Sequence, residues 1–125
     1  MAQILIIEDD IPLRQALTKH LEELGHVVRQ ASHGAEAIAS LQRLPAAVAI
    51  VDIFMPGQGG LQTIGRIKQD WPETGVIAIS GAASGGTLDV RQHALALGAD
   101  RFLRKPFDVE ALVDLVNGLL PEGAR

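Results

Sequence analysis

Short apolar runs alternate along the chain with longer segments in which apolar residues recur every three or four positions. The runs have the composition of buried strands, because a strand covered on both faces reads as a continuous apolar stretch. They predict strands at residues 4–7, 27–31, 46–51, 76–79 and 101–104. The helical spacing predicts helices over 12–24, 34–44 and 61–71, a fourth that starts between 84 and 87 and ends at 97, and a fifth that ends at 119.

Several residues mark where these elements begin and end. Pro12 suits the first turn of a helix, and Gly25 suits the position just after the last turn. Ser32 and Asp108 are the predicted N-caps of the second and fifth helices, since their side-chain oxygens accept hydrogen bonds from unpaired backbone amides. Asp10 has two interpretations, a third acid of a functional site or the cap of the first helix, and its place favours the cap.

This alternation predicts an α/β fold. Five strand–helix units with short connections form a parallel sheet, and right-handed crossovers place helices on both of its faces in a doubly wound arrangement. The 125 residues, of which 47% are hydrophobic, suffice for one core. We therefore expect one domain spanning residues 1–125.

Polar side chains follow four of the predicted strands. The first strand ends on Glu8 and Asp9, the third on Asp52, the fourth on Ser80 and the fifth on Lys105. A lone acid such as Asp52 would usually cap the following loop. If the four strands are parallel neighbours, however, these side chains meet at one edge of the sheet, where ligands of open α/β sheets bind.

The chemistry of such a cluster favours a divalent cation. Three carboxylates in one crevice repel one another, and a hard cation neutralises them. Mg²⁺ prefers oxygen ligands and often engages a phosphate as well, and Mn²⁺ fits similar ligands. An aspartate oxygen that stays accessible can then attack phosphorus, while a lysine, a hydroxyl and backbone amides meet the charge of the phosphoryl group.

Composition excludes several other functions. The net charge of -4 gives no electrostatic footprint for nucleic acid or an anionic membrane. The chain lacks cysteine, a signal peptide pattern and an apolar run long enough to span a bilayer, so we expect a cytoplasmic protein. The four histidines share no motif, and we interpret them as surface or helix residues rather than as ligands or phosphodonors.

Four stretches together carry a family resemblance that covers the whole chain. The combination of ILIIEDD, VDIFMPGQGG, VIAISG and GADRFLRKPF, in this order, resembles the receiver domain of two-component response regulators. The resemblance implies the flavodoxin-like strand order 2-1-3-4-5, which brings the first and third strands together.

The resemblance also implies a role for each site residue. The metal is bound by Asp9 and Asp52, by the backbone carbonyl of Phe54, and by Glu8, which helps to hold the water shell of the ion. The implied phosphoacceptor is Asp52, with phosphate contacts from Ser80, the amide of Gly81 and Lys105. Ser80 and Phe102 are the implied switch residues, and the less favoured alternative for Phe102 is a core residue. The bond between Lys105 and Pro106 is a candidate cis peptide.

As a receiver domain the chain would be a signalling phosphoacceptor that catalyses only its own phosphorylation and dephosphorylation. It would take phosphoryl from a phosphohistidine on a histidine kinase or a histidine phosphotransfer protein. The face made by the fourth helix, fifth strand and fifth helix would then change and control an output domain or downstream protein.

Three alternatives stay open. A degenerate receiver would bind partners without phosphorylation, which the complete set of site residues disfavours. A flavodoxin-like FMN carrier needs a phosphate-cradling loop where this chain has EDDIPLR, and a haloacid-dehalogenase-like phosphatase needs an acid at the position of Phe54.

The resemblance leaves the oligomeric state undetermined. The last helix lacks the basic residues that pair across symmetric dimers in one DNA-binding subgroup of the family. Since no effector domain follows Arg125, the regulator is either a single domain or part of a longer chain.

Overall fold

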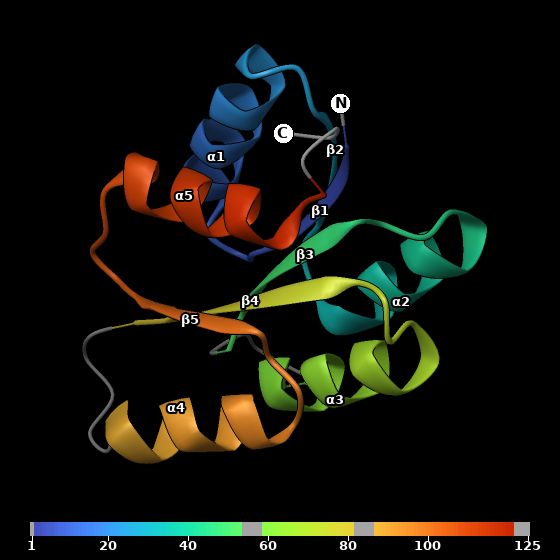
Figure 1. Cartoon of the computed structure of the whole chain (residues 1–125), viewed down its shortest axis with the longest axis vertical. Helices are drawn as coiled ribbons and strands as arrows, with labels where there is room; N and C mark the ends of the chain where they lie inside the picture. The colour runs from blue at the N-terminus through green and yellow to red at the C-terminus, as the bar shows by residue number, and fades with distance from the viewer. Residues whose placement is uncertain (1, 54–58, 82–86, 122–125) are drawn as a thin grey trace.

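The fold is a five-stranded parallel sheet between two layers of helices (Figure 1). The computed structural model describes residues 2–53, 59–81 and 87–121. The elements in chain order are β1 (Gln3–Ile7), α1 (Ile11–Glu23), β2 (Val27–Ala31), α2 (Gly34–Arg43), β3 (Val48–Asp52), α3 (Gly60–Asp70), β4 (Gly75–Ser80), α4 (Thr87–Ala96), β5 (Arg101–Arg104) and α5 (Val109–Leu119).

The strand order is β2-β1-β3-β4-β5 with every pair parallel, which confirms the predicted topology. Alternate residues of each strand face opposite layers, as the two-residue period of a strand requires. In β1, for example, Ile4 and Ile6 pack with α1 and α5, whereas Leu5 and Ile7 pack with α2 and α3. Figure 1 shows α1 and α5 on one side of the sheet and α2, α3 and α4 on the other.

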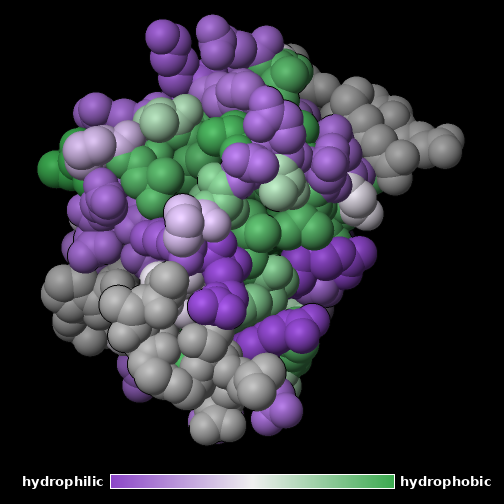
Figure 2. Space-filling view, turned by 90° about the vertical axis from the view of Figure 1, so that its left-hand side faces the viewer, coloured by the Kyte–Doolittle hydropathy of each residue, from purple (hydrophilic) through white to green (hydrophobic). Residues whose placement is uncertain are grey.

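The side of the molecule at the left of Figure 1 carries an apolar band bordered by hydrophilic atoms (Figure 2). Helix α5 is apolar beyond the face that it buries. Leu112 and Val116 are buried, and Val109 and Val113 are half-buried against the same core.

None of the helices in the described parts of the chain combines the length and the apolar character needed to cross a membrane.

Most element boundaries differ from the predicted ones by one or two residues, the usual uncertainty of helix and strand ends. Gly25 and Gly98 follow α1 and α4 with φ angles of 94° and 112°, so each takes the left-handed conformation that suits glycine after a helix. Strand β3 extends to Asp52, so this acid is the last residue of the strand itself. Asp108 is the N-cap of α5, although its side chain makes no capping hydrogen bond.

The predicted N-cap of the second helix is wrong by one residue. His33 caps α2, because its Nδ1 accepts a hydrogen bond of 3.3 Å from the backbone amide of Glu36. The first intrahelical bond of α2 accordingly ends on the His33 carbonyl, to which the Ala37 amide donates over 3.1 Å. Ser32 lies one position outside the helix, and its own backbone amide donates to Glu36 Oε1 over 2.9 Å.

The interpretation of all four histidines as surface or helix residues is also wrong for His26. This side chain is buried between the end of α1 and the start of β2. Its Nδ1 accepts a hydrogen bond of 3.3 Å from the backbone amide of Ala2, which satisfies the buried polar ring. Burial lowers the pKa of His26, because it disfavours the charged imidazolium.

Candidate functional site

Three acids follow β1, and they lie in different surroundings. Glu8 is fully buried, and its backbone amide donates to the carbonyl of Ala31 in β2 over 3.1 Å. Asp9 is exposed. Asp10 is the N-cap of α1, since its Oδ1 accepts from the amide of Leu13 over 3.2 Å, which confirms the predicted helix cap. The backbone amide of Asp10 donates to Glu8 Oε2 over 3.2 Å, so a backbone hydrogen bond orients the carboxylate of Glu8.

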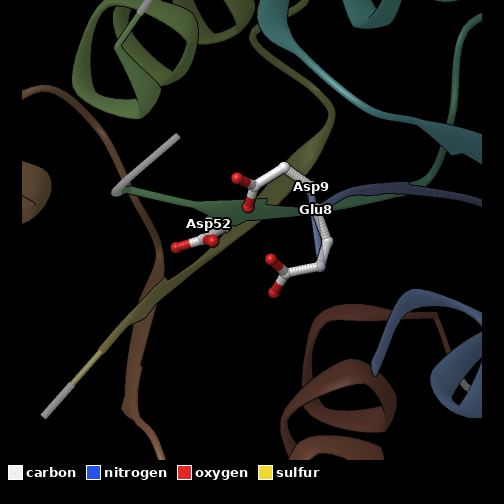
Figure 3. Close-up of side chains that lie close together, drawn as sticks. All are labelled: Glu8, Asp9 and Asp52. Atoms are coloured by element: carbon white, nitrogen blue, oxygen red, sulfur yellow. The ribbon is translucent and has the colours of Figure 1, made fainter. Parts of the chain in front are cut away.

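The end of β3 brings a further acid to the same place. Ile7 of β1 pairs with Val51 of β3, so the residues that follow them, Glu8 and Asp52, lie side by side. Asp52 is 3% exposed. One carboxylate oxygen each from Glu8, Asp9 and Asp52 lie within 4.8 Å of one another. Figure 3 shows the side chains of Glu8 and Asp9 extending from the end of β1 toward Asp52. The structure thus brings together the three acids that the sequence singled out.

Lys105 reaches this cluster from the connection between β5 and α5. Its backbone amide donates to the carbonyl of Ser80 over 2.8 Å, which fixes the start of the connection against β4. Its Nζ lies 2.8 Å from Glu8 Oε1 and 3.4 Å from Asp52 Oδ2. The Lys105–Pro106 peptide bond is cis, as the sequence led us to expect. One ammonium group therefore bridges two buried carboxylates that come from different strands.

Burial and neighbouring charges shift the pKa values of Glu8 and Lys105. Burial is the main cause that raises the pKa of Glu8, and the neighbouring Asp52 acts in the same direction while Lys105 opposes both. Burial alone would lower the pKa of Lys105, but the two carboxylates outweigh it and raise this pKa. Lys105 therefore stays an ammonium between the two buried acids Glu8 and Asp52.

The donor set fits a hard divalent cation. Carboxylate oxygens are the ligands that Mg²⁺ prefers, and an ion of this kind is usually bound by one or two carboxylates with several waters. The exposed Asp9 gives the cluster access to solvent beside two buried acids. Phe54, whose backbone carbonyl the sequence suggested as a further ligand, lies outside the described residues.

Ser80 and Gly81 lie at the same edge of the sheet. Ser80 is the last residue of β4 and is fully buried. Asp52 pairs with Ile79, so Ser80 lies one residue further along the neighbouring strand. The hydroxyl of Ser80 donates to the carbonyl of Gly81 over 3.4 Å, a long contact that leaves the group poorly bound. Among the described residues, a β-carbon at Gly81 would meet nothing within 4 Å.

Phe102 lies in β5 and is half-buried. It packs against the core cluster that lies between the sheet and helices α2 and α3. A half-buried ring is consistent with both interpretations from the sequence, a switch residue and a core residue.

Two residues of the site were not found from the sequence. The guanidinium of Arg14 in α1 donates from Nη1 to the backbone carbonyl of Glu8 over 2.8 Å. Gly60, the first residue of α3, approaches the end of β3 so closely that a β-carbon there would overlap the carbonyl oxygen of Asp52. For the close approach of Gly60, the only sequence signal was a glycine after a predicted turn. No sequence pattern indicated the hydrogen bond from Arg14.

Comparison with known proteins gives a consistent picture. The family described as "Response regulator receiver domain" matches residues 4–117. The chain is 35% identical over 115 residues to the response regulator protein FleR of Pseudomonas aeruginosa, covering 92% of this chain and 24% of FleR. It is 32% identical over 120 residues to protein PilH of the same organism, covering 96% of this chain and 98% of PilH.

Solved structures agree with these matches. The receiver domain of NtrX from Brucella abortus has a TM-score of 0.86 at 28% identity, covering 94% of this chain and 97% of that one. Chemotaxis protein CheY4 of Vibrio cholerae also has a TM-score of 0.86 at 28% identity, covering 96% and 99% of the two chains. The chain spans about a quarter of some curated relatives, FleR and an NtrC regulator among them, and nearly all of PilH. This chain belongs to the receiver domain family of two-component response regulators.

Proposed function

We propose that the chain is a phosphoacceptor that takes a phosphoryl group onto Asp52 from a phosphohistidine of a partner protein. The observation that carries this proposal is the ammonium group of Lys105, which lies 2.8 Å from Glu8 and 3.4 Å from Asp52 at the carboxyl edge of the sheet. A fixed cation beside a buried carboxylate is what a phosphoryl group needs when it arrives with its negative charge.

We take the roles of the acids from the resemblance to receiver domains, and the clustering of their oxygens supports a shared metal site. Asp9 and Asp52 would bind Mg²⁺, or Mn²⁺ in its place, and Glu8 would help to hold the water shell of the ion. The carbonyl of Phe54 completes the proposed ligand set. When bound, the ion neutralises part of the charge on the phosphoryl oxygens during transfer.

Transfer requires one bond to form and one to break. A carboxylate oxygen of Asp52 attacks phosphorus, and the bond between phosphorus and the histidine nitrogen of the donor breaks. The donor imidazole leaves as the neutral ring after taking up a proton from solvent. Lys105, the hydroxyl of Ser80 and the amide of Gly81 contact the phosphoryl oxygens and stabilise their charge.

The acyl phosphate then acts as a switch. Ser80 turns its hydroxyl toward the phosphoryl group, and the long bond of 3.4 Å to the Gly81 carbonyl is little hindrance to this rotation. Phe102, which is half-buried, moves inward to fill the space. The face made by α4, β5 and α5 changes with it. The charge of the phosphoryl group on Asp52 thus shifts the equilibrium between two conformations of this face.

The partners follow from the family. Receiver domains of response regulators interact with histidine kinases and with output domains, and relatives such as NtrC and NtrX carry output domains. We propose a histidine kinase or a histidine phosphotransfer protein as the donor and an output domain or downstream protein as the receiver of the signal. Residues 1–125 would act as one receiver domain.

Intact mass measurement tests the phosphoacceptor directly. We expect the protein to gain one phosphoryl group when it is incubated with Mg²⁺ and acetyl phosphate, and to gain none when EDTA removes the metal. Asp52→Asn should abolish the gain. Asp10→Asn is the matched control, since Asn also caps helices and this variant should be phosphorylated like the parent. An adduct that persists at undiminished yield in Asp52→Asn would overturn the proposal.

A further inference from the structure

The exposed Asp9 depends on the backbone for its position. It lies between the buried Glu8 and the helix cap Asp10, and it contributes one oxygen to the carboxylate cluster. In the described parts of the chain, no side chain or amide donates a hydrogen bond to the Asp9 carboxylate. The peptide units on either side of such a residue set the direction of its Cα–Cβ bond, and therefore which positions its carboxylate can reach.

Arg14 fixes one of these peptide units. Its Nη1 donates a hydrogen bond of 2.8 Å to the carbonyl of Glu8, and this carbonyl belongs to the peptide that joins Glu8 to Asp9. The amide of Glu8 is fixed separately, by the bond of 3.1 Å to the carbonyl of Ala31 in β2. The backbone that carries both acids is therefore held from two directions just beyond the last paired residue of β1.

Hydrogen bonds also hold the guanidinium and the backbone of Arg14 itself. Its Nε donates to the side chain of Gln30 in β2 over 3.0 Å. Within α1, the Arg14 amide donates to the Asp10 carbonyl over 2.9 Å, and the Arg14 carbonyl accepts from the Thr18 hydroxyl over 2.7 Å. The planar fork of the arginine thus reaches two acceptors at once, which a lysine cannot do with the same geometry.

From these contacts we infer that Arg14 is a positioning residue for divalent cation binding. It touches neither the proposed ion nor the phosphoacceptor, and it acts by holding the Glu8–Asp9 peptide so that the Asp9 carboxylate faces Asp52. This inference rests on the proposed metal site. Groups that orient metal ligands commonly change metal affinity ten- to a hundredfold when they are removed.

Binding of Mn²⁺ without a phosphodonor provides the test, because the electron paramagnetic resonance signal of free Mn²⁺ measures occupancy directly. Arg14→Met keeps the apolar stem and removes the donors, and we expect it to weaken Mn²⁺ binding about tenfold or more. Arg14→Lys, which keeps a donor for the Glu8 carbonyl, should recover part of the loss. Gln30→Ala alters only an exposed side chain, so it should fold normally and weaken binding about two- to threefold.

Thr18→Val is the matched control for a general loosening of α1. It removes the hydroxyl bond to the Arg14 carbonyl while keeping the shape of the buried side chain. We expect it to lower the melting temperature and to change Mn²⁺ affinity less than twofold.

Three outcomes would overturn the inference: parental affinity in Arg14→Met, an equal loss in Thr18→Val, or no Mn²⁺ binding by the parent. A parent that binds Mn²⁺ but is never phosphorylated on Asp52 would refute the phosphoacceptor proposal. The role of Arg14 in cation binding would be unaffected by that result.

Discussion

Gly60→Ala should destabilise the protein by pushing α3 away from the phosphoacceptor strand. A β-carbon at Gly60 would overlap the carbonyl oxygen of Asp52 and would lie 2.5 Å from Ile53 Cα and 2.7 Å from Ile53 O. Carbon atoms in contact normally lie about 3.5–4.0 Å apart. All three neighbours are backbone atoms, so relief requires the start of α3 to move by roughly an ångström.

Such a shift breaks a hydrogen bond as well. The amide of Gly60 donates to the Ile53 carbonyl over 3.1 Å, and moving it away by about 1 Å would exceed the hydrogen-bond range. Overpacking of this kind costs about 1–3 kcal/mol, and the lost bond adds about 1 kcal/mol. The better helix propensity of alanine offsets up to about 1 kcal/mol. The free energy of unfolding should therefore fall by about 1–4 kcal/mol.

Thermal unfolding followed by circular dichroism measures this effect. For 125 residues the unfolding entropy is about 0.26 kcal/mol/K, so the melting temperature should fall by roughly 4–15 °C. Gly118→Ala in α5 is the control, because a β-carbon there meets nothing within 4 Å. It should raise the melting temperature by about 2–4 °C through helix propensity. A Gly60→Ala protein that melts within about 2 °C of the parent would refute the reasoning, because a β-carbon would then fit between Gly60 and the end of β3 without displacing α3.

Three further predictions concern the site and the histidine between α1 and β2. Asp9→Ala should weaken Mn²⁺ binding strongly, whereas Asp10→Ala should leave it nearly unchanged and cost about 1 kcal/mol of stability as a lost N-cap; equal losses of affinity would contradict the assignment. His26, whose pKa burial lowers, binds a proton more readily in the unfolded chain, so its stabilisation is present above pH 6.5 and is lost as the pH falls below that value. The difference in unfolding free energy between the parent and His26→Gln should shrink accordingly in urea titrations from pH 7.5 to 5.5, and a constant difference would refute this. Phe54→Asn should speed loss of the phosphoryl group without preventing phosphorylation, because an amide can orient water and a phenyl ring cannot; an unchanged decay of the phosphorylated mass would show that this position does not control the water.

The order of the elements and the edge that carries the site were predictable because local signals agree with the fold. The apolar runs end on Glu8, Asp52 and Lys105, and a parallel sheet brings such ends together whatever the details of packing. The cap at Asp10 was predictable for the same reason, since it depends on residues within one helical turn.

Contacts between distant elements were not predictable in this way. The bond from Arg14 to Gln30 depends on how α1 lies against β2, and the approach of Gly60 to Asp52 depends on how the start of α3 packs against the end of β3. His26 follows the end of a helix, where no periodicity indicates which side chains are buried. His33 replaced Ser32 as a cap because both can accept a bond, and the position of the first helical turn decides between them.

The most direct test of the central claim is to identify the residue that carries the phosphoryl group. Borohydride reduces an acyl phosphate to the corresponding alcohol, so a phosphorylated aspartate is converted into homoserine, which peptide mass spectrometry can locate. After incubation with Mg²⁺ and acetyl phosphate, we expect homoserine at position 52 and at no other acid. Modification at Glu8, Asp9 or Asp10 instead, or modification at position 52 that persists when the metal is removed, would contradict the account.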